Sequence, residues 1–311
     1  MPEPLSIPPV AHFITLGQTI SWSHAFAIAS ATRVGMTNVF LHHASPLPET
    51  PQIAFLRSLA SVTLRALDVE KYLRQVGAEL DIASLPHLYR LSADRTVREC
   101  IVHAALIYQL GGIYLAPETL MVGPLPEGMT RQVFFGSRFI FPRRNAFAFP
   151  ERVLTGLTRR LRHQRVAHGK RPVPPFAAIS SVFGAVPKAP FLALWLRSLI
   201  SERAGTVSDA DTLLRRLLDA CTDPEVVVEP PEMMCTFSSG SAGRLFSHAS
   251  ASRIPAMIPP SARVIHWQSC PRTRQREAEI CPDHVMENAY QQLYSSLIWH
   301  HVPAVKNIVY L

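Results

Sequence analysis

The stretch that decides the fold is Leu106-Ile107-Tyr108-Gln109-Leu110-Gly111-Gly112-Ile113-Tyr114-Leu115-Ala116-Pro117-Glu118. Its first half completes an apolar helix expected over residues 94–110, with Ser92 capping the first turn. The glycine pair ends this helix, because glycine adopts helix-stopping backbone conformations without a steric penalty. Residues 113–115 are then predicted to form a short buried strand, and Pro117 limits further pairing because it has no N–H. Ala116 and Glu118 therefore lie at the carboxyl end of a strand, where open α/β sheets bind ligands.

Strands and helices are expected to alternate on both sides of this stretch. Short apolar runs predict buried strands over residues 10–17, 38–43, 134–141 and 176–182. Helical patterns cover residues 25–34, 53–73, 151–168, 191–203 and 209–221, and the small polar residues of 236–252 predict a loop. The alternation predicts an α/β fold with a parallel sheet, and the absence of a convincing linker predicts one domain over residues 1–311.

The composition is that of a globular protein. Hydrophobic residues make up 48% of the chain and charged residues 17%, which is enough apolar material for a large core and too little charge for disorder. The apolar runs are too short to span a bilayer, and Met1 to Pro9 lacks the basic and apolar regions of a secretory signal. The five cysteines form no C-x-x-C pair. A reducing, cytoplasmic location is therefore expected, with peripheral contact to a membrane as an option.

Four segments, in order along the chain, resemble the glycosyltransferase family defined by a DXD sugar-binding region. This family includes α-mannosyl-, α-1,4-galactosyl- and N-acetylglucosaminyltransferases. The block Gly111-Gly112-Ile113-Tyr114-Leu115 is the most specific match. The others are Ile7-Pro8 through His12 to Gly17, Ala178 to Ser181 with Pro187 to Phe191, and Val264 to Trp267. The resemblance implies a GT-A-like fold, which is a Rossmann-like mixed sheet flanked by helices, and a nucleoside-diphosphate sugar as donor.

The sequence departs from the family at the motif that binds metal. Where the family has Asp-x-Asp, this chain has Ala116-Pro117-Glu118. That motif presents two carboxylates to a divalent cation, Mn²⁺ or Mg²⁺, which neutralises the diphosphate leaving group. Ala116 cannot bind a cation, whereas Glu118 keeps one carboxylate and is the candidate metal ligand, with His266 as its candidate partner. The alternatives are an exposed carboxylate at a strand end, a packed histidine, and a cation site that has been lost.

Other candidate residues for the nucleotide sugar follow from the same resemblance. Counting back from Gly111 places Cys100 and His103 where the family has an Asp and an Arg, and Asp94 and Arg98 are their candidate displaced equivalents. His12 and Thr15 are expected to line the nucleobase end of the site, or else to be structural. The complete set of candidate nucleotide-sugar residues is His12, Thr15, Asp94, Arg98, His103, Gly111, Gly112, Ala116 and Glu118.

The net charge of +8 favours an anionic partner, which could be a diphosphate or an acidic membrane surface. One basic run covers Arg159 to Arg171 and is expected to be a solvated helix face. Arg272, Arg274 and Arg276 form a second cluster, which would be aligned if that segment were extended. Either cluster could neutralise a diphosphate in place of a lost metal. Aromatic residues are not interleaved with these clusters, so nucleic-acid binding is not expected.

The sequence thus favours an enzyme that transfers a hexosyl unit from a nucleoside-diphosphate sugar to a hydroxyl group of a glycan, lipid or protein. The resemblance implies retention of the anomeric configuration. The alternative is a non-catalytic relative that keeps the fold and acts as a binding or accessory protein, and Ala116, Cys100 and His103 favour it. No residue can be named as a catalytic base from the sequence, and the acceptor is open.

Overall fold

The computed structural model describes residues 6–125, 131–139, 176–201, 210–238 and 240–309. Its centre is a seven-stranded sheet of order β3-β2-β1-β4-β7-β6-β8. Only β7 runs antiparallel to its neighbours, so the sheet is mixed but mostly parallel. The strands are β1 Val10–Thr15, β2 Asn38–His43, β3 Val62–Ala66, β4 Gly112–Leu115, β6 Val133–Phe139, β7 Phe176–Ala185 and β8 Val226–Val228.

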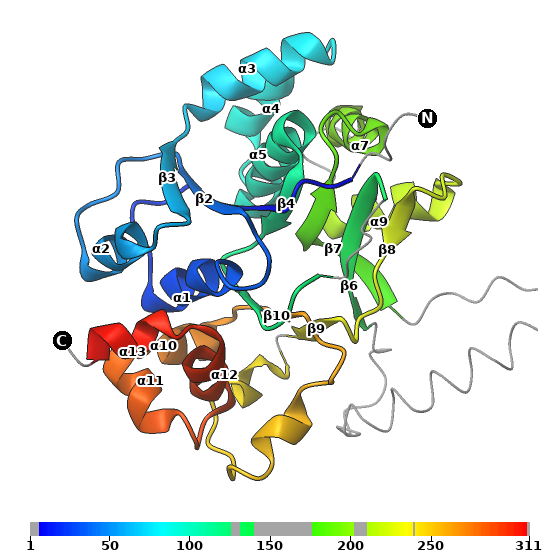
Figure 1. Cartoon of the computed structure of the whole chain (residues 1–311). Helices are drawn as coiled ribbons and strands as arrows, with labels where there is room; N and C mark the ends of the chain where they lie inside the picture. Colours follow the sequence, from blue (N-terminus) through cyan, green and yellow to red (C-terminus); the bar gives the residue numbers. More distant parts are fainter. Residues whose placement is uncertain (1–5, 126–130, 140–175, 202–209, 239, 310–311) are drawn as a thin grey trace, which may run out of the picture.

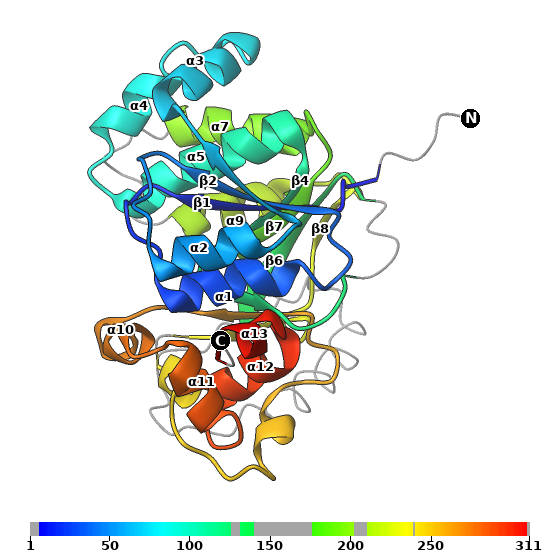
Figure 2. The same ribbon diagram turned by 60° about the vertical axis from the view of Figure 1, so that its left-hand side comes forward.

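Helices cover both faces of this sheet. The face carrying α1 and α2 is opposite to the face carrying α5 and α7, as the two views show together (Figures 1 and 2). Helix α9 packs against α5 and α7 on the latter face. These helices are α1 Trp22–Ala31, α2 Pro51–Ser58, α3 Val69–Glu79, α4 Leu85–Leu91, α5 Arg95–Leu110, α7 Pro190–Ser201 and α9 Ala210–Ala220. The predicted α/β class, with a Rossmann-like mixed sheet flanked by helices, is confirmed.

A second, three-stranded sheet of order β5-β10-β9 joins the C-terminal helices to this core. Strand β10 pairs antiparallel with β5 and parallel with β9. Helices α10 and α12 contact α1, so the C-terminal helices form a layer beneath α1 in both views (Figures 1 and 2). The elements are β5 Thr119–Met121, β9 Met234–Phe237, β10 Val264–Trp267, the 3₁₀ turns Ala242–Arg244 and Ile254–Met257, α10 Pro271–Ala278, α11 Pro282–Asn288, α12 Leu293–His301 and α13 Ala304–Val309.

The decisive stretch folds as expected around its glycines. Gly111 has φ +69° and caps α5 by donating its N–H to the Ile107 carbonyl at 2.8 Å. Gly112 has φ +92° and opens β4 beside His12 of β1. The predicted helix cap is wrong, however: Asp94 caps α5 by accepting from the Thr96 N–H at 2.8 Å. The Ser92 hydroxyl instead donates to the Leu88 carbonyl, at the end of α4.

Three other expectations are corrected. Residues 53–73 are not one helix, because β3 lies between α2 and α3. Residues 236–252 are not all loop, since β9 continues to Phe237 and a 3₁₀ turn follows. The segment with Arg272, Arg274 and Arg276 is helix α10, so residues two apart lie on different sides. The helix expected over 151–168 and the basic run from Arg159 to Arg171 lie outside the described residues.

A partly buried polar network joins α9 to the sheet, and it predicts a stability effect. The Asp211 carboxylate accepts from the backbone N–H and hydroxyl of Ser180, at 3.0 and 2.8 Å, and lies 3.6 Å from Arg138. Asp211→Ala removes these contacts together, and we expect it to lower the free energy of unfolding by about 2–3 kcal/mol. Urea denaturation measures this loss. The exposed Asp219→Ala on the same helix is the control, and equal losses for both would contradict the prediction.

Candidate functional site

The carboxyl ends of β1 and β4 lie side by side at the point where the chain changes direction across the sheet. From β1 the strands run outward through β2 to β3, whereas β4 pairs with the other side of β1. The connection after β1 passes through α1 on one face, and the connection into β4 arrives through α5 on the other (Figure 1). Open α/β sheets bind ligands in the crevice at such a switch point.

Six charged or titratable side chains from four parts of the chain gather at this edge. We name them the switch-point cluster, and they are His24 of α1, Arg95 and Glu99 of α5, Glu118 after β4, and Arg274 and Glu277 of α10. We group these residues because their charges shift the pKa values of His24 and Glu118, and because α10 contacts α1. The cluster brings together residues separated by up to 253 positions in the chain, from His24 to Glu277.

Glu118 lies at the centre of the cluster. Its carbonyl accepts from the Trp267 N–H at 3.1 Å, which joins the end of β4 to β10. Its carboxylate lies 4.0 Å from the His24 ring Nε2, and 31% of its side chain is exposed. Loss of hydration raises the pKa of Glu118, and the nearby Glu99 raises it further, whereas Arg95 and Arg274 lower it. Burial lowers the pKa of His24, so the imidazole is mostly neutral at pH 7.

The other two carboxylates of the cluster already have close partners. The Arg95 guanidinium donates from Nε to Glu99 at 2.7 Å, one helical turn away on α5. Glu277 is 8% exposed, and both its oxygens accept from the Ser269 hydroxyl, at 3.1 and 3.2 Å. Two helices begin at this edge, because His24 lies in the first turn of α1 and Arg95 in the first turn of α5. Helix N-termini carry partial positive charge and favour anions.

The residues at the altered motif do not fit a divalent cation. Ala116 is 8% exposed, and its backbone is engaged on both sides, since its N–H donates to Ser181 and its carbonyl accepts from Thr119. His266 is paired with Thr119 across the β5–β10 ladder, one position from the Glu118–Trp267 contact. Successive residues of a strand face opposite sides of the sheet, so His266 faces the side of β10 opposite to Trp267, whose N–H binds the Glu118 carbonyl.

The surroundings of His266 support this conclusion. The ring is 5% exposed, and burial, together with the charge of Arg138, lowers its pKa to about 3. Arg138 belongs to β6 and is not part of the switch-point cluster. Among the residues that the structure describes, no group of three His, Cys, Asp or Glu side chains could hold a metal ion. The fold therefore does not bring together Glu118 and His266, the two metal ligands suggested by the sequence.

The candidate nucleobase residues on β1 have different surroundings. Thr15 is 9% exposed at the end of the strand, and its hydroxyl accepts from the Gly17 N–H at 3.3 Å. His12 is 1% exposed and hydrogen-bonds His42 through ring nitrogens 3.0 Å apart. The pair lies within the sheet, and burial lowers both pKa values. Thr15 is thus the residue of the two that reaches the switch-point edge.

The candidates on α5 are also separated by the fold. His103 is 3% exposed and packs among Tyr114, Phe183 and Trp195, with ring centroids 4.3 to 5.9 Å from its own. This placement makes it a core residue of the aromatic cluster, because no open surface leads to its ring. Asp94 is used as the helix cap, and the Arg98 Nε is buried without a hydrogen-bond partner among the described residues. Gly111 and Gly112 shape the turn into β4.

Sequence reasoning missed His24, Arg95, Glu99 and Glu277. Each is an isolated charged or polar residue on a helix, without a motif around it. One signal was present: His24 and Arg95 lie at the starts of helices that flank the two strands meeting at the switch point. Arg274 was noticed only as part of a basic cluster, and its effect on the pKa of Glu118 depends on the fold of the last third of the chain.

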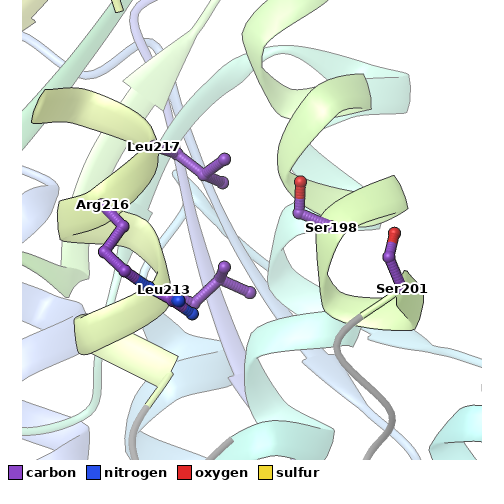
Figure 3. A pocket seen from close by; sticks show the side chains of 5 residues that line it. All are labelled: Ser198, Ser201, Leu213, Arg216 and Leu217. Atoms are coloured by element: carbon purple, nitrogen blue, oxygen red, sulfur yellow. The ribbon is translucent and has the colours of Figure 1, made fainter. Parts of the chain in front are cut away.

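A small pocket lies elsewhere, between α7 and α9 (Figure 3). It is about 220 Å³ in volume and is lined by Ser198 and Ser201 on one helix and by Leu213, Arg216 and Leu217 on the other. Ligand pockets usually have volumes of about 300–1,000 Å³, so this one is small for a nucleotide sugar. It shares no residue with the switch-point cluster. Separately, no helix in the described ranges combines the length and apolarity needed to cross a membrane.

The sequence and the structure were compared with known proteins. No protein-family model matches the sequence, and no curated protein matches it either. Among solved structures, the chain is similar to one described as "PaToxG Glycosyltransferase", with 13% sequence identity and a TM-score of 0.45. The similarity covers 69% of this chain and 69% of that chain.

Proposed function

We propose that this protein is a glycosyltransferase that uses a nucleoside-diphosphate sugar bound at the switch-point edge. The donor's hexosyl unit passes to a hydroxyl group of a glycan, lipid or protein. The bond between the anomeric carbon and the β-phosphate oxygen breaks, and the nucleoside diphosphate leaves with the electron pair. The acceptor oxygen bonds to the anomeric carbon and loses its proton.

One observation supports this proposal above the others. The switch-point cluster lies where parallel α/β sheets place their ligands, and it contains both arginines and the start of two helices. Such an edge suits a substrate with a diphosphate beside a polar sugar, because the phosphates need positive charge and the sugar hydroxyls need hydrogen-bond partners. Glu118 and His24 can provide those partners at the same place. Thr15, at the end of β1, is positioned to meet the nucleoside.

Calorimetric titration with UDP- and GDP-sugars, each with and without Mn²⁺, tests the donor. We expect saturable binding of one of these donors at a single site per chain, and weaker binding of the free nucleoside because it lacks the phosphates. Hydrogen exchange measured with and without the donor should show protection in residues 16–24, 95–99, 116–118 and 271–278. Ser198→Trp, which fills the pocket between α7 and α9, is the control and should leave binding unchanged. Failure of every nucleotide to bind would exclude the proposal.

A non-catalytic binding protein is the second candidate, and Ala116 is the observation that favours it. The buried methyl group removes one carboxylate from the motif that binds the cation in the resembled family. Donor hydrolysis and transfer to simple acceptors separate the two candidates. An enzyme releases nucleoside diphosphate from the bound donor, at least slowly into water. A binding protein holds the same donor and releases none.

A further inference from the structure

His24 and Glu118 bring a ring nitrogen and a carboxylate together at the switch-point edge. The His24 Nε2 lies 4.0 Å from the Glu118 Oε1, and 26% and 31% of the two side chains are exposed. Within the described part of the chain, no other side chain hydrogen-bonds the Glu118 carboxylate, and the His24 ring has no second polar partner. Both groups are therefore open to a ligand from solution.

The backbones that carry these two side chains are fixed relative to each other. The His24 N–H donates to the Ser21 hydroxyl at 3.2 Å, which caps the first turn of α1. Farther along α1, the Ser30 hydroxyl accepts from the Met121 N–H at 2.9 Å. Met121 ends β5, the strand that follows Glu118 directly. Helix α1 is thus bonded to the segment that begins at Glu118, so the side chains meet on a rigid frame.

An imidazole nitrogen and a carboxylate oxygen are both ligands of first-row transition-metal ions. Two such atoms on one ion lie about 3.0–3.5 Å apart, since each is about 2.1 Å from the metal. His24 and Glu118 would have to approach by roughly 0.5–1 Å, which a small rotation of these partly exposed side chains provides. Two protein ligands suffice in a phosphate-binding site, because the phosphates and water complete the coordination.

We propose that a first-row transition-metal ion such as Mn²⁺ binds between His24 and Glu118, and that His24 supplies the ligand that Ala116 cannot. The inference rests on the proposed function, because the donor's phosphate oxygens complete the coordination. It also specifies which ions the site accepts. Nitrogen ligands favour transition metals over Mg²⁺ and Ca²⁺, so Co²⁺ should bind more tightly than Mn²⁺, and Mg²⁺ should bind most weakly.

The test measures binding of Mn²⁺ itself, from the loss of the EPR signal of the free ion, without nucleotide and with UDP or GDP. We expect one Mn²⁺ per chain. His24→Gln and Glu118→Gln should each weaken its binding at least about tenfold. The pulsed EPR spectrum of bound Mn²⁺ should show coupling to a nitrogen nucleus, and this coupling should disappear in His24→Gln. For Mg²⁺, measured by competition, His24→Gln should weaken binding less than it does for Mn²⁺.

His87→Gln is the matched control, because it removes an exposed histidine from α4. It should leave both the Mn²⁺ affinity and the nitrogen coupling unchanged. Circular dichroism and thermal melting show whether His24→Gln and Glu118→Gln are folded, and each variant tests the site if the other does not fold. Equal weakening by His87→Gln, or nitrogen coupling that persists in His24→Gln, would overturn the inference.

The remaining outcomes separate this inference from the proposed function. If nucleotide sugars bind equally well in EDTA and in Mn²⁺, and His24→Gln does not alter the metal response, the inference fails and the function stands. If Mn²⁺ binds through His24 and Glu118 but no nucleotide sugar binds, the function fails and the cation site stands. Mn²⁺ binding that depends on both residues and strengthens nucleotide-sugar binding supports the two together.

Discussion

Gly112→Ala is expected to destabilise the folded chain by about 3 kcal/mol or more, one of the two largest effects we predict. Gly112 has φ +92°, a backbone conformation that is strained for any residue with a side chain. An added Cβ would also lie 2.8 Å from the Val10 carbonyl oxygen. It would also lie 2.9 Å from the His12 ring. The backbone of β1 cannot move away, because β1 is paired on both sides. Urea denaturation followed by circular dichroism measures the change.

Gly35→Ala separates the two causes of this loss. Gly35 has φ +83° but no atom within 4 Å of its added Cβ, so the variant carries only the backbone strain. We expect it to cost about 1–2 kcal/mol. Gly243→Ala, with neither a positive φ nor a nearby atom, should change stability by less than about 0.5 kcal/mol. If Gly112→Ala and Gly35→Ala cost the same, the close approach of β1 and β4 is not what requires Gly112.

Acidification from pH 7 to pH 5 is expected to destabilise the chain through its buried neutral histidines. Burial lowers the pKa of His103 to about 3 in the folded state, compared with the ordinary value of 6.5. The unfolded chain therefore binds the proton first, so stability is complete above pH 6.5 and is lost as the pH falls toward 3. At pH 5 the loss is about 2 kcal/mol for His103 alone. The His12–His42 pair, whose pKa values are also lowered, adds to it.

The variant His103→Phe measures how much of this loss of stability at low pH comes from His103. Phenylalanine keeps a ring among Tyr114, Phe183 and Trp195 and cannot be protonated. We expect its urea midpoint to fall less between pH 7 and pH 5 than that of the wild type. The exposed His87→Gln should retain the wild-type slope. A slope for His103→Phe equal to that of the wild type would show that His103 does not remain neutral in the folded chain at pH 5.

The part of the fold that sequence reasoning predicted well is the part with strong local signals. The strand predicted over residues 38–43 is β2, with the same bounds. The glycine pair ends α5 and begins β4, as expected. Strand β3 was missed because it is a half-exposed edge strand that lies within residues 53–73, a stretch with a helical pattern. Three of its five residues are exposed, so its alternating pattern was weaker than the helical pattern around it.

The candidate site was predicted only in part, because the sequence does not show in which direction each side chain points. A count along α5 placed His103 at a ligand position, but the helix turns its ring toward Tyr114 and Trp195. A late histidine suggested a metal ligand, but the register of β10 against β5 pairs His266 with Thr119, and it is Trp267 whose backbone contacts Glu118. Arg272, Arg274 and Arg276 seemed alike in sequence. In helix α10, the Arg276 side chain hydrogen-bonds the preceding loop, whereas the Arg274 side chain is exposed.

By itself, the sequence determined the α/β class, the turn at Gly111–Gly112, and the delivery of Glu118 to the end of a strand. These properties depend on local periodicity and on the conformational freedom of glycine, which are fixed by neighbouring residues. Only the tertiary structure decided which charges surround Glu118, because His24, Arg95 and Arg274 meet it from three helices. Electrostatic interactions depend on distance in space. These distances are set by the fold, which brings separate helices to the switch point.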